Sequence, residues 1–217
     1  MTNSLKIKSI NIAENLSLED ISAELDKLDE MHQINIASWE EFSYKPQVEF
    51  KVAYHSGNLF IKYYVGEKYI RAVNVNTNES VWEDSCVEFF VAPDDTVNYF
   101  NFEVNCIGTC LVQKGEKREG RKFLAPDEIK NINSFSSLGN SPFSERKGSF
   151  VWNLTLMIPL VSICGLQQES LKGLKMKANF YKCGDKLSEM HFLSWNPIGT
   201  AQPDFHQPDY FGELEFI

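Results

Sequence analysis

The stretch from Val81 to Phe90, VWEDSCVEFF, decides the fold class of this chain of 217 residues. From Cys86 to Val91 the residues alternate as in a β-strand, with Val87, Phe89 and Val91 on one face. An ionised Glu88 on the other face costs desolvation unless it is paired or faces a wet groove. Trp82 precedes the strand, and an aromatic ring beside a carboxylate is a common way to hold a sugar. A core Trp with a Glu in a structural ion pair fits the segment equally well.

A second alternating run, Phe100 to Cys106, follows a polar turn and predicts a hairpin with the first strand. If Val91 pairs with Asn98, Glu88 lies across from Asn101. One face of the hairpin then carries the polar residues Glu88, Asn101, Glu103 and Asn105. Acids and amides on one face indicate a binding surface, with an ordinary solvated sheet face as the alternative.

The rest of the chain also alternates with a period of two, and this predicts an all-β fold. Further strands are expected at 48–54, 59–65, 150–158, 174–180 and 214–216. The best helix runs from Ser17 to Met31, with Ser17 as its cap and Asp20 as the capping-box partner. A short helix is expected from Pro126 to Ile132, and residues 133–148 read as a long connection. We therefore predict one domain, residues 1–217, in which an antiparallel β-sandwich or jelly roll spans about 44–217 and one N-terminal helix lies outside it.

Charge and composition limit the partners. The net charge of −9 argues against nucleic acid and anionic membrane surfaces, while a neutral ligand stays open. No apolar run approaches membrane-spanning length, and the N-terminus has no apolar core of a signal peptide. Five cysteines in no zinc-ribbon or disulfide spacing favour a reducing compartment. We expect a cytoplasmic protein, although a chain whose leader had been removed would look the same and would be periplasmic or secreted.

The second informative segment is His191 to Ile198, HFLSWNPI. Trp195 stands among turn-forming residues, including Asn196 and Pro197, and such a position favours an exposed aromatic plate over a strand residue. The alternative is a Trp folded over a loop to cover the core.

Metal and catalytic patterns are weak. The separations of His191, His206 and Cys183 match no zinc pattern. A calcium site could draw on Glu83, Asp84, Asp94 and Asp95, but a solvated acidic loop is favoured. Glu88 and Glu103 could be the two carboxylates of a glycoside hydrolase, which needs a separation that the sequence does not supply.

In their order, these pieces resemble carbohydrate-binding module family 9, in particular its family-9-like, free-standing subgroup. The matching stretches are VWEDSCVEFF, YFNFEVNCIGT at 99–109, ANFYKCGD at 178–185, HFLSWNPI and PDFHQPDYFGELEF. The resemblance covers nearly all of the chain after Val48, and it implies a jelly roll that binds sugars and takes part in carbohydrate catabolism. It also implies two Trp that clamp a sugar, polar groups on its hydroxyls and structural calcium ions. By this resemblance, Trp82 and Trp195 match the two Trp of the clamp, and Glu88 matches a residue that binds sugar hydroxyls. Arg71, a lone Arg at a strand end, is assigned as the basic ligand.

These observations together predict a non-catalytic domain that binds a mono-, oligo- or polysaccharide. No cofactor is required, structural calcium is allowed, and the metal ligands and any partner enzyme are left unassigned. The predicted sugar-binding residues are Trp82, Glu88, Trp195, Asn105, Arg71, Glu103 and Asn196. A glycoside hydrolase using Glu88 and Glu103, or an interaction domain with both Trp in the core, are the alternatives.

Overall fold

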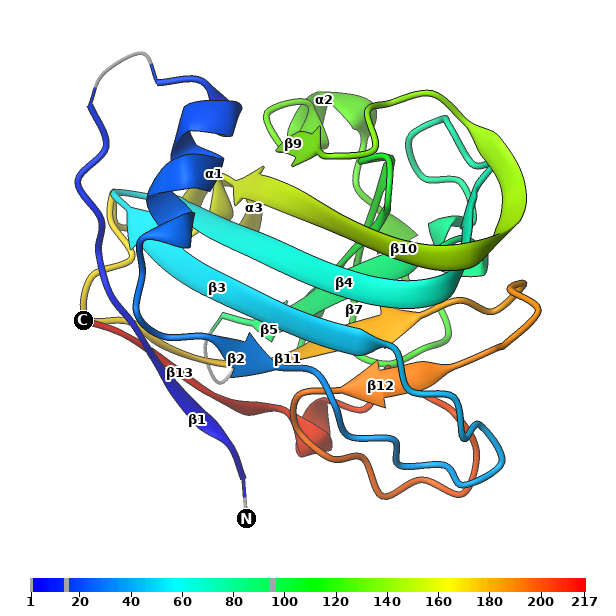
Figure 1. Cartoon of the computed structure of the whole chain (residues 1–217). Coiled ribbons are helices and arrows are strands. Elements are labelled where there is room, and N and C mark those ends of the chain that lie inside the picture. The colour runs from blue at the N-terminus through cyan, green and yellow to red at the C-terminus, as the bar shows by residue number, and fades with distance from the viewer. Residues whose placement is uncertain (1, 14–15, 94–96) are drawn as a thin grey trace.

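Two β-sheets pack face to face in a computed structural model that describes residues 2–13, 16–93 and 97–217 (Figure 1). Within these residues the smaller sheet has five strands, in the order β2 (His32–Gln33), β3 (Gln47–His55), β4 (Asn58–Ala72), β10 (Phe143–Ile158) and β9 (Asn133–Ser136). The larger has eight, in the order β1 (Ser4–Ile7), β13 (Gly212–Phe216), β11 (Lys175–Cys183), β5 (Cys86–Ala92), β6 (Tyr99–Asn105), β7 (Cys110–Gly115) and β8 (Lys122–Phe123), with β12 (Phe192–Ser194) beside β11. The predicted antiparallel sandwich is confirmed, with one parallel pair, β1 and β13.

Alternation along the strands builds the core between the sheets. Val87 and Phe89 of β5 point inward, as predicted, and both are fully buried. Phe50 of the smaller sheet stacks on Phe180 of the larger one, with ring centroids 4.2 Å apart. Because both sheets send every second side chain into this layer, the other face of each sheet is left for the helix or for loops.

The N-terminal helix is shorter than predicted. Helix α1 spans Leu18–Asp26, and the reciprocal bonds between Ser17 and Asp20 form the expected capping box. The helix ends at Asp26, and the Lys51 ammonium donates to the carbonyls of Asp26 and Leu28, which gives partners to carbonyls at and just after the helix end. Its apolar side packs on the outer face of the smaller sheet, through Ile21 and Leu25 on Ala53 and Phe60.

The region predicted as a long connection contains two strands instead. Helix α2 (Pro126–Ile129) is followed by β9 and then by β10, which begins at Phe143 and pairs with β4. The register shifts twice before Phe150, and the residues there are mostly exposed and polar. Irregular pairing hides the period of two, so the sequence showed only the second half of β10. A short helix, α3 (Leu160–Cys164), follows.

The predicted hairpin forms with a different register. Val91 pairs with Phe100 rather than with Asn98, so Glu88 lies directly across from Glu103 and not from Asn101. The shift is two residues, and this keeps each side chain on its predicted face while changing its partner.

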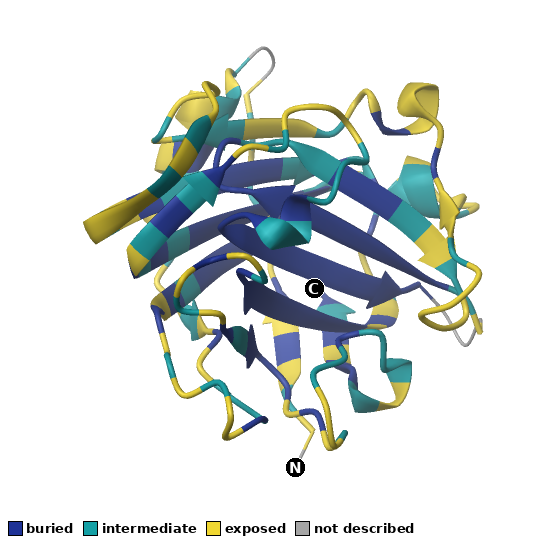
Figure 2. Ribbon diagram, turned by 90° about the vertical axis from the view of Figure 1, so that its right-hand side faces the viewer, coloured by how far each residue is buried: buried dark blue, intermediate teal, exposed yellow. Residues whose placement is uncertain are grey.

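The outer face of the larger sheet is covered rather than solvated. A second apolar cluster on this face joins Phe90 and Tyr181 of the sheet to Trp39, Phe205 and Phe211 of the surrounding segments. Figure 2 shows strands buried along most of their length. In the described part of the chain, no helix is long and apolar enough to cross a membrane.

Candidate functional site

A cavity of about 280 Å³ opens on the outer face of the larger sheet. Its floor comes from the strands β5, β6, β7 and β11, through Glu88, Phe90, Glu103, Gln113 and Cys183. Its walls come from segments far away in the sequence, through Trp82, Phe192, Pro203, Phe205 and His206. Charged groups complete the lining, namely Arg118, Arg121, Asp185 and Asp204. Aromatic rings and polar groups therefore converge in one hollow, as is typical of small-molecule sites.

A larger depression of about 890 Å³ lies elsewhere, along Thr77, Gly108, Lys130 and Phe135. Among its lining residues, Lys130 is the one charged side chain and Phe135 the one aromatic ring. Volume alone favours this depression, but the chemistry favours the smaller cavity, because several aromatic rings and charged side chains meet there.

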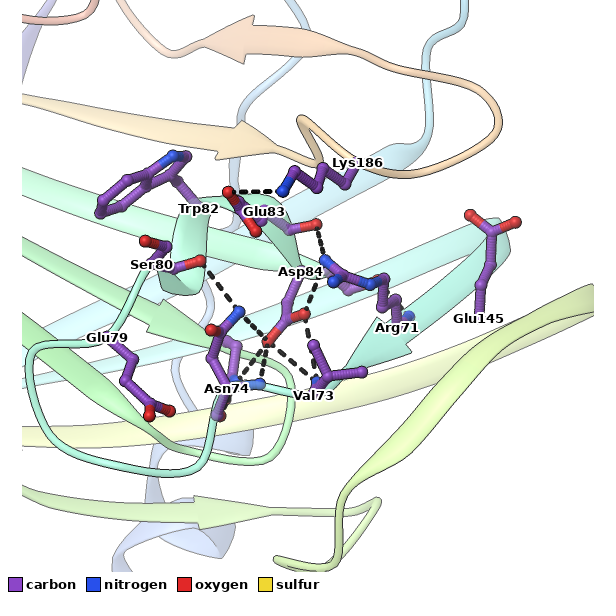
Figure 3. Close-up of polar contacts among 12 residues, drawn as sticks. Arg71, Val73, Asn74, Glu79, Ser80, Trp82, Glu83, Asp84, Glu145 and Lys186 are labelled. Atoms are coloured by element: carbon purple, nitrogen blue, oxygen red, sulfur yellow. Dashed lines mark hydrogen bonds and ion pairs between the residues drawn. The ribbon is translucent and has the colours of Figure 1, made fainter.

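Trp82 stands at the wall of the cavity on a short 3₁₀ helix, η1 (Val81–Glu83). Its backbone is tied to the loop after β11, since the Asp185 amide donates to the Trp82 carbonyl at 3.1 Å. Lys186 of the same loop forms an ion pair with Glu83 (Figure 3), and the nitrogen–oxygen distance is 3.0 Å. The indole itself is only half-buried. These contacts hold the turn in place, while part of Trp82 stays exposed and lines the cavity.

Asp84 is the centre of the polar network beneath this turn (Figure 3). Its carboxylate accepts hydrogen bonds from the amides of Val73 and Asn74 and from the Asn105 side chain, and it pairs with Arg71 at 3.1 Å. Arg71 and Asn105 therefore support the loop that carries Trp82 and do not line the cavity. Their prediction as sugar ligands is not supported by their positions, because a buried aspartate uses both.

Glu88 and Glu103 meet on the floor of the cavity as direct cross-strand partners. The Asn101 amide donates to Glu103 at 2.8 Å, and the Cys183 thiol donates to Glu88 at 3.0 Å. Burial, with a smaller contribution from the Glu103 charge, raises the pKa of Glu88 well above its usual range. Burial also raises the pKa of Glu103 to about 7 and that of Asp185 to about 6. The floor can thus present protonated or ionised carboxyl groups near neutral pH.

Arg121 and His206 also line the cavity, and neither of them was assigned to sugar binding from the sequence. The Arg121 guanidinium donates to Asn101 Oδ1 at 2.6 Å and lies 4.0 Å from the centre of the Tyr99 ring. His206 Nδ1 is 2.9 Å from the Tyr99 hydroxyl, and burial, followed by the charge of Arg121, lowers the pKa of His206 to about 4. Arg121 lies between charged residues and glycines in the sequence, where no strand pattern marks it as a site residue. His206 and Phe205 stand in the quoted stretch PDFHQPDY, where an aromatic pair between prolines was the available signal.

Trp195 and Asn196 are not at the cavity. Trp195 is 7% exposed, belongs to the core between the sheets and meets Phe180 edge to face at 5.7 Å. The Asn196 side chain donates to the Tyr210 carbonyl and accepts from the Asn3 amide. The prediction of Trp195 as an exposed plate is wrong, because the pairing of β12 with β11 turns the indole inward. Within the described residues, the structure does not join Trp82 and Trp195 into one clamp.

Among the described residues, the candidate metal ligands considered from the sequence are engaged in other contacts. Asp84 has its oxygens occupied by N–H donors, Glu83 pairs with Lys186, and Asp94 and Asp95 lie outside the described residues. Glu83 and Asp84 therefore do not fit a calcium site. His191 lies in the interior, 2.9 Å from the Lys182 ammonium, while His206 contacts Tyr99. His206 and Cys183 line the same cavity, but among the described residues neither histidine joins Cys183 in a cluster of possible metal ligands.

Comparison with known proteins agrees with this architecture. A candidate carbohydrate-binding protein from Bacteroides uniformis is 39% identical and has a TM-score of 0.95, with 100% of both chains covered. A family 9 carbohydrate-binding module from Caldicellulosiruptor kristjanssonii, solved with glucose, is 14% identical with a TM-score of 0.62, covering 99% of this chain and 96% of that one. The structure of a family 9 module from the same organism with cellotriose is 15% identical with a TM-score of 0.56, covering 99% and 93%.

No curated protein matches the chain. The two similarities at 14% and 15% identity show the fold alone. The sequence model of carbohydrate-binding family 9, in contrast, matches residues 19–216, which is nearly the entire chain. The chain therefore belongs to carbohydrate-binding family 9.

Proposed function

We propose that this chain binds one saccharide ring, without cleaving it, in the cavity above Glu88 and Glu103. The observation that carries the proposal is the half-buried Trp82 beside two carboxyl groups in one hollow. The apolar face of a sugar stacks on an aromatic ring, and its hydroxyls bond to carboxyl groups. In complexes solved with relatives of the same fold, glucose and cellotriose are bound, and this supports a saccharide as the ligand here.

The size of the cavity supports a short ligand. About 280 Å³ is near the lower end of the roughly 300–1,000 Å³ of small-molecule sites. Phe192 and Phe205 line the same cavity as Trp82, and they replace Trp195 as the proposed partners in apolar contact with the ring. Gln113 adds an amide that can donate to hydroxyls and accept from them.

The positions of the two carboxyl groups favour binding over hydrolysis. Glycoside hydrolases place their two carboxyl groups on either side of the scissile bond. Glu88 and Glu103 are neighbours on one face of a sheet, so both approach a ligand from the same side. This arrangement suits two hydrogen-bond partners of one sugar face and does not flank a glycosidic bond.

Titration calorimetry with glucose, xylose, galactose and cellotriose tests the proposal. We expect Trp82→Ala to weaken binding of the best sugar by at least about tenfold, because a stacking contact of roughly 0.5–1.5 kcal/mol is lost together with buried area. Glu103→Gln should weaken it too, since one acceptor oxygen is lost. Phe135→Ala, in the larger depression, is the matched control and should leave affinity unchanged.

Intrinsic fluorescence gives a second readout, because Trp39, Trp152 and Trp195 are buried and Trp82 is not. A sugar-induced change should disappear in Trp82→Phe. If Phe135→Ala abolishes binding while Trp82→Ala does not, the site lies in the larger depression and the proposal is refuted. Release of product from aryl glycosides, lost in Glu88→Gln, would refute the non-catalytic assignment.

A further inference from the structure

We propose that Cys86, Glu88 and Cys183 form a binding site for one thiophilic divalent ion, of the zinc or cadmium class, at the floor of the cavity. One ligand atom from each of the three residues lies within 4.8 Å of the other two. A tetrahedral zinc ion has bonds of about 2.3 Å to sulfur and 2.0–2.2 Å to oxygen, so its ligand atoms are about 3.5–3.8 Å apart. Small side-chain rotations would bring the three atoms to these distances.

The strands hold these donors in place before any ion arrives. Cys86 and Glu88 are two residues apart on β5 and therefore share a face. Cys183 of the neighbouring β11 is the direct register partner of Cys86. The Cys183 sulfur is 3.0 Å from Glu88 Oε1. All three residues are buried in the same sheet, and ligands on rigid strands lose little freedom when an ion binds.

The surroundings of the three donors are acidic, and in the part of the chain that the structure describes, basic side chains lie near them without forming ion pairs with these acids. Glu103 lies directly across from Glu88, and Asp185 contacts the Cys183 thiol. Among the described residues, no ion pair involves Glu88, Glu103 or Asp185. Two ionised carboxylates directly opposite each other on a sheet repel, and a bound cation would relieve this repulsion.

The nearby basic side chains are engaged elsewhere. The Lys182 ammonium pairs with Glu67 at 3.0 Å and also bonds to His191 and the Cys183 carbonyl. The Arg121 guanidinium is held by Asn101 and by main-chain carbonyls. A bound divalent ion would supply the positive charge that these side chains do not bring to the donors.

The donor set selects the class of ion. Two thiolates and one carboxylate suit zinc-like ions, whereas calcium and magnesium prefer oxygen ligands alone. Cys183 and Glu88 both line the cavity, so the fourth side of a tetrahedron opens towards it. Water or the Asp185 carboxylate could complete the coordination there. This site differs from a calcium site in the loops, and it does not depend on the proposed saccharide binding.

The test is a titration of metal-free, phosphine-reduced full-length chain with Cd²⁺ alone, without sugar. Cadmium–thiolate bonds give an ultraviolet charge-transfer band that reports the ligands directly. We expect one Cd²⁺ per chain, a higher melting temperature, displacement by Zn²⁺ and no displacement by excess Ca²⁺. Cys86→Ser and Cys183→Ser should each halve the band and weaken affinity by about a hundredfold or more, since even outer-shell partners are worth 10–100-fold.

Cys164→Ser in α3 is the matched control and should bind Cd²⁺ as the unaltered chain does. Circular dichroism in chelator shows whether each variant folds. If either buried serine variant fails to fold, Glu88→Gln decides, with the band retained and Cd²⁺ affinity lowered by about tenfold or more. The proposal is overturned if no band forms, if the band survives loss of both cysteines, or if it depends on Cys164. Loss of sugar binding in the calorimetry above would leave this result unaffected.

Discussion

Truncating Trp195 to alanine should destabilise the fold strongly, while truncating Trp82 should not. Trp195 is 7% exposed and packs edge to face on Phe180 within the core between the sheets. Removing a buried Trp costs about 3–5 kcal/mol, because the side chain loses its transfer free energy and its neighbours lose their packing around the void that it leaves. For a domain of this size, each kcal/mol lowers the melting temperature by about 2–4 °C, so a decrease of roughly 6–20 °C is expected.

Trp82 is half-buried at the cavity wall and lies on a turn that the Asp84 network already holds. We therefore expect Trp82→Ala to lower the free energy of unfolding by about 1 kcal/mol or less. The assay is thermal and urea unfolding followed by far-ultraviolet circular dichroism, which does not depend on the indoles. Phe123→Ala is the control, since this ring is 54% exposed. A Trp195→Ala variant that melts within about 2 °C of the original chain would refute the placement of Trp195 in the core.

Two further predictions concern the pH dependence and the packing around Trp195. Burial lowers the pKa of His206 from 6.5 to about 4. Between these two pH values only the unfolded chain binds the proton, so the free energy of unfolding falls as the pH drops from 6.5 to 4, by on the order of 3 kcal/mol. The His206→Gln variant does not lose this contribution at low pH. In urea unfolding, the stability advantage of the original chain over this variant should therefore shrink from pH 7.5 to pH 4, and an advantage that stays constant would contradict the prediction. A methyl group at Gly212 would lie 2.3 Å from the Trp195 ring, so Gly212→Ala should cost about 1–3 kcal/mol in a thermal melt. Gly66→Ala, whose nearest atom would be 3.7 Å away, should melt close to the original chain.

The side chains themselves determine which residues face inward. In β5, apolar residues at every second position all lie on one face of the strand, and this face is expected to be buried. Val87 and Phe89 were therefore assigned correctly from the sequence. The capping box of Ser17 and Asp20 is also local, because both partners lie within one helical turn. Trp82, Glu88 and Glu103 could be selected for the same reason, since an acid on a strand face and an indole at its edge are unusual wherever the strand goes.

Partners across the fold depend on register and on loop paths, which the alternation does not specify. A shift of two residues keeps every side chain on its face, so the pattern could not distinguish Asn101 from Glu103 as the partner of Glu88. From the sequence, Arg71 and Asn105 were available as sugar ligands. In the fold, both contact the Asp84 carboxylate instead.

The cavity walls are decided by tertiary structure alone. Phe192, Phe205 and His206 reach the floor of β5 and β6 only because the chain returns over the larger sheet about a hundred residues later. The same return pairs β12 with β11 and turns Trp195 into the core. Local sequence determines the face on which a side chain lies, because strand geometry repeats every two residues. Which distant segment covers that face is determined by the packing of the whole chain, because burial free energy depends on contacts between segments that the local pattern does not encode.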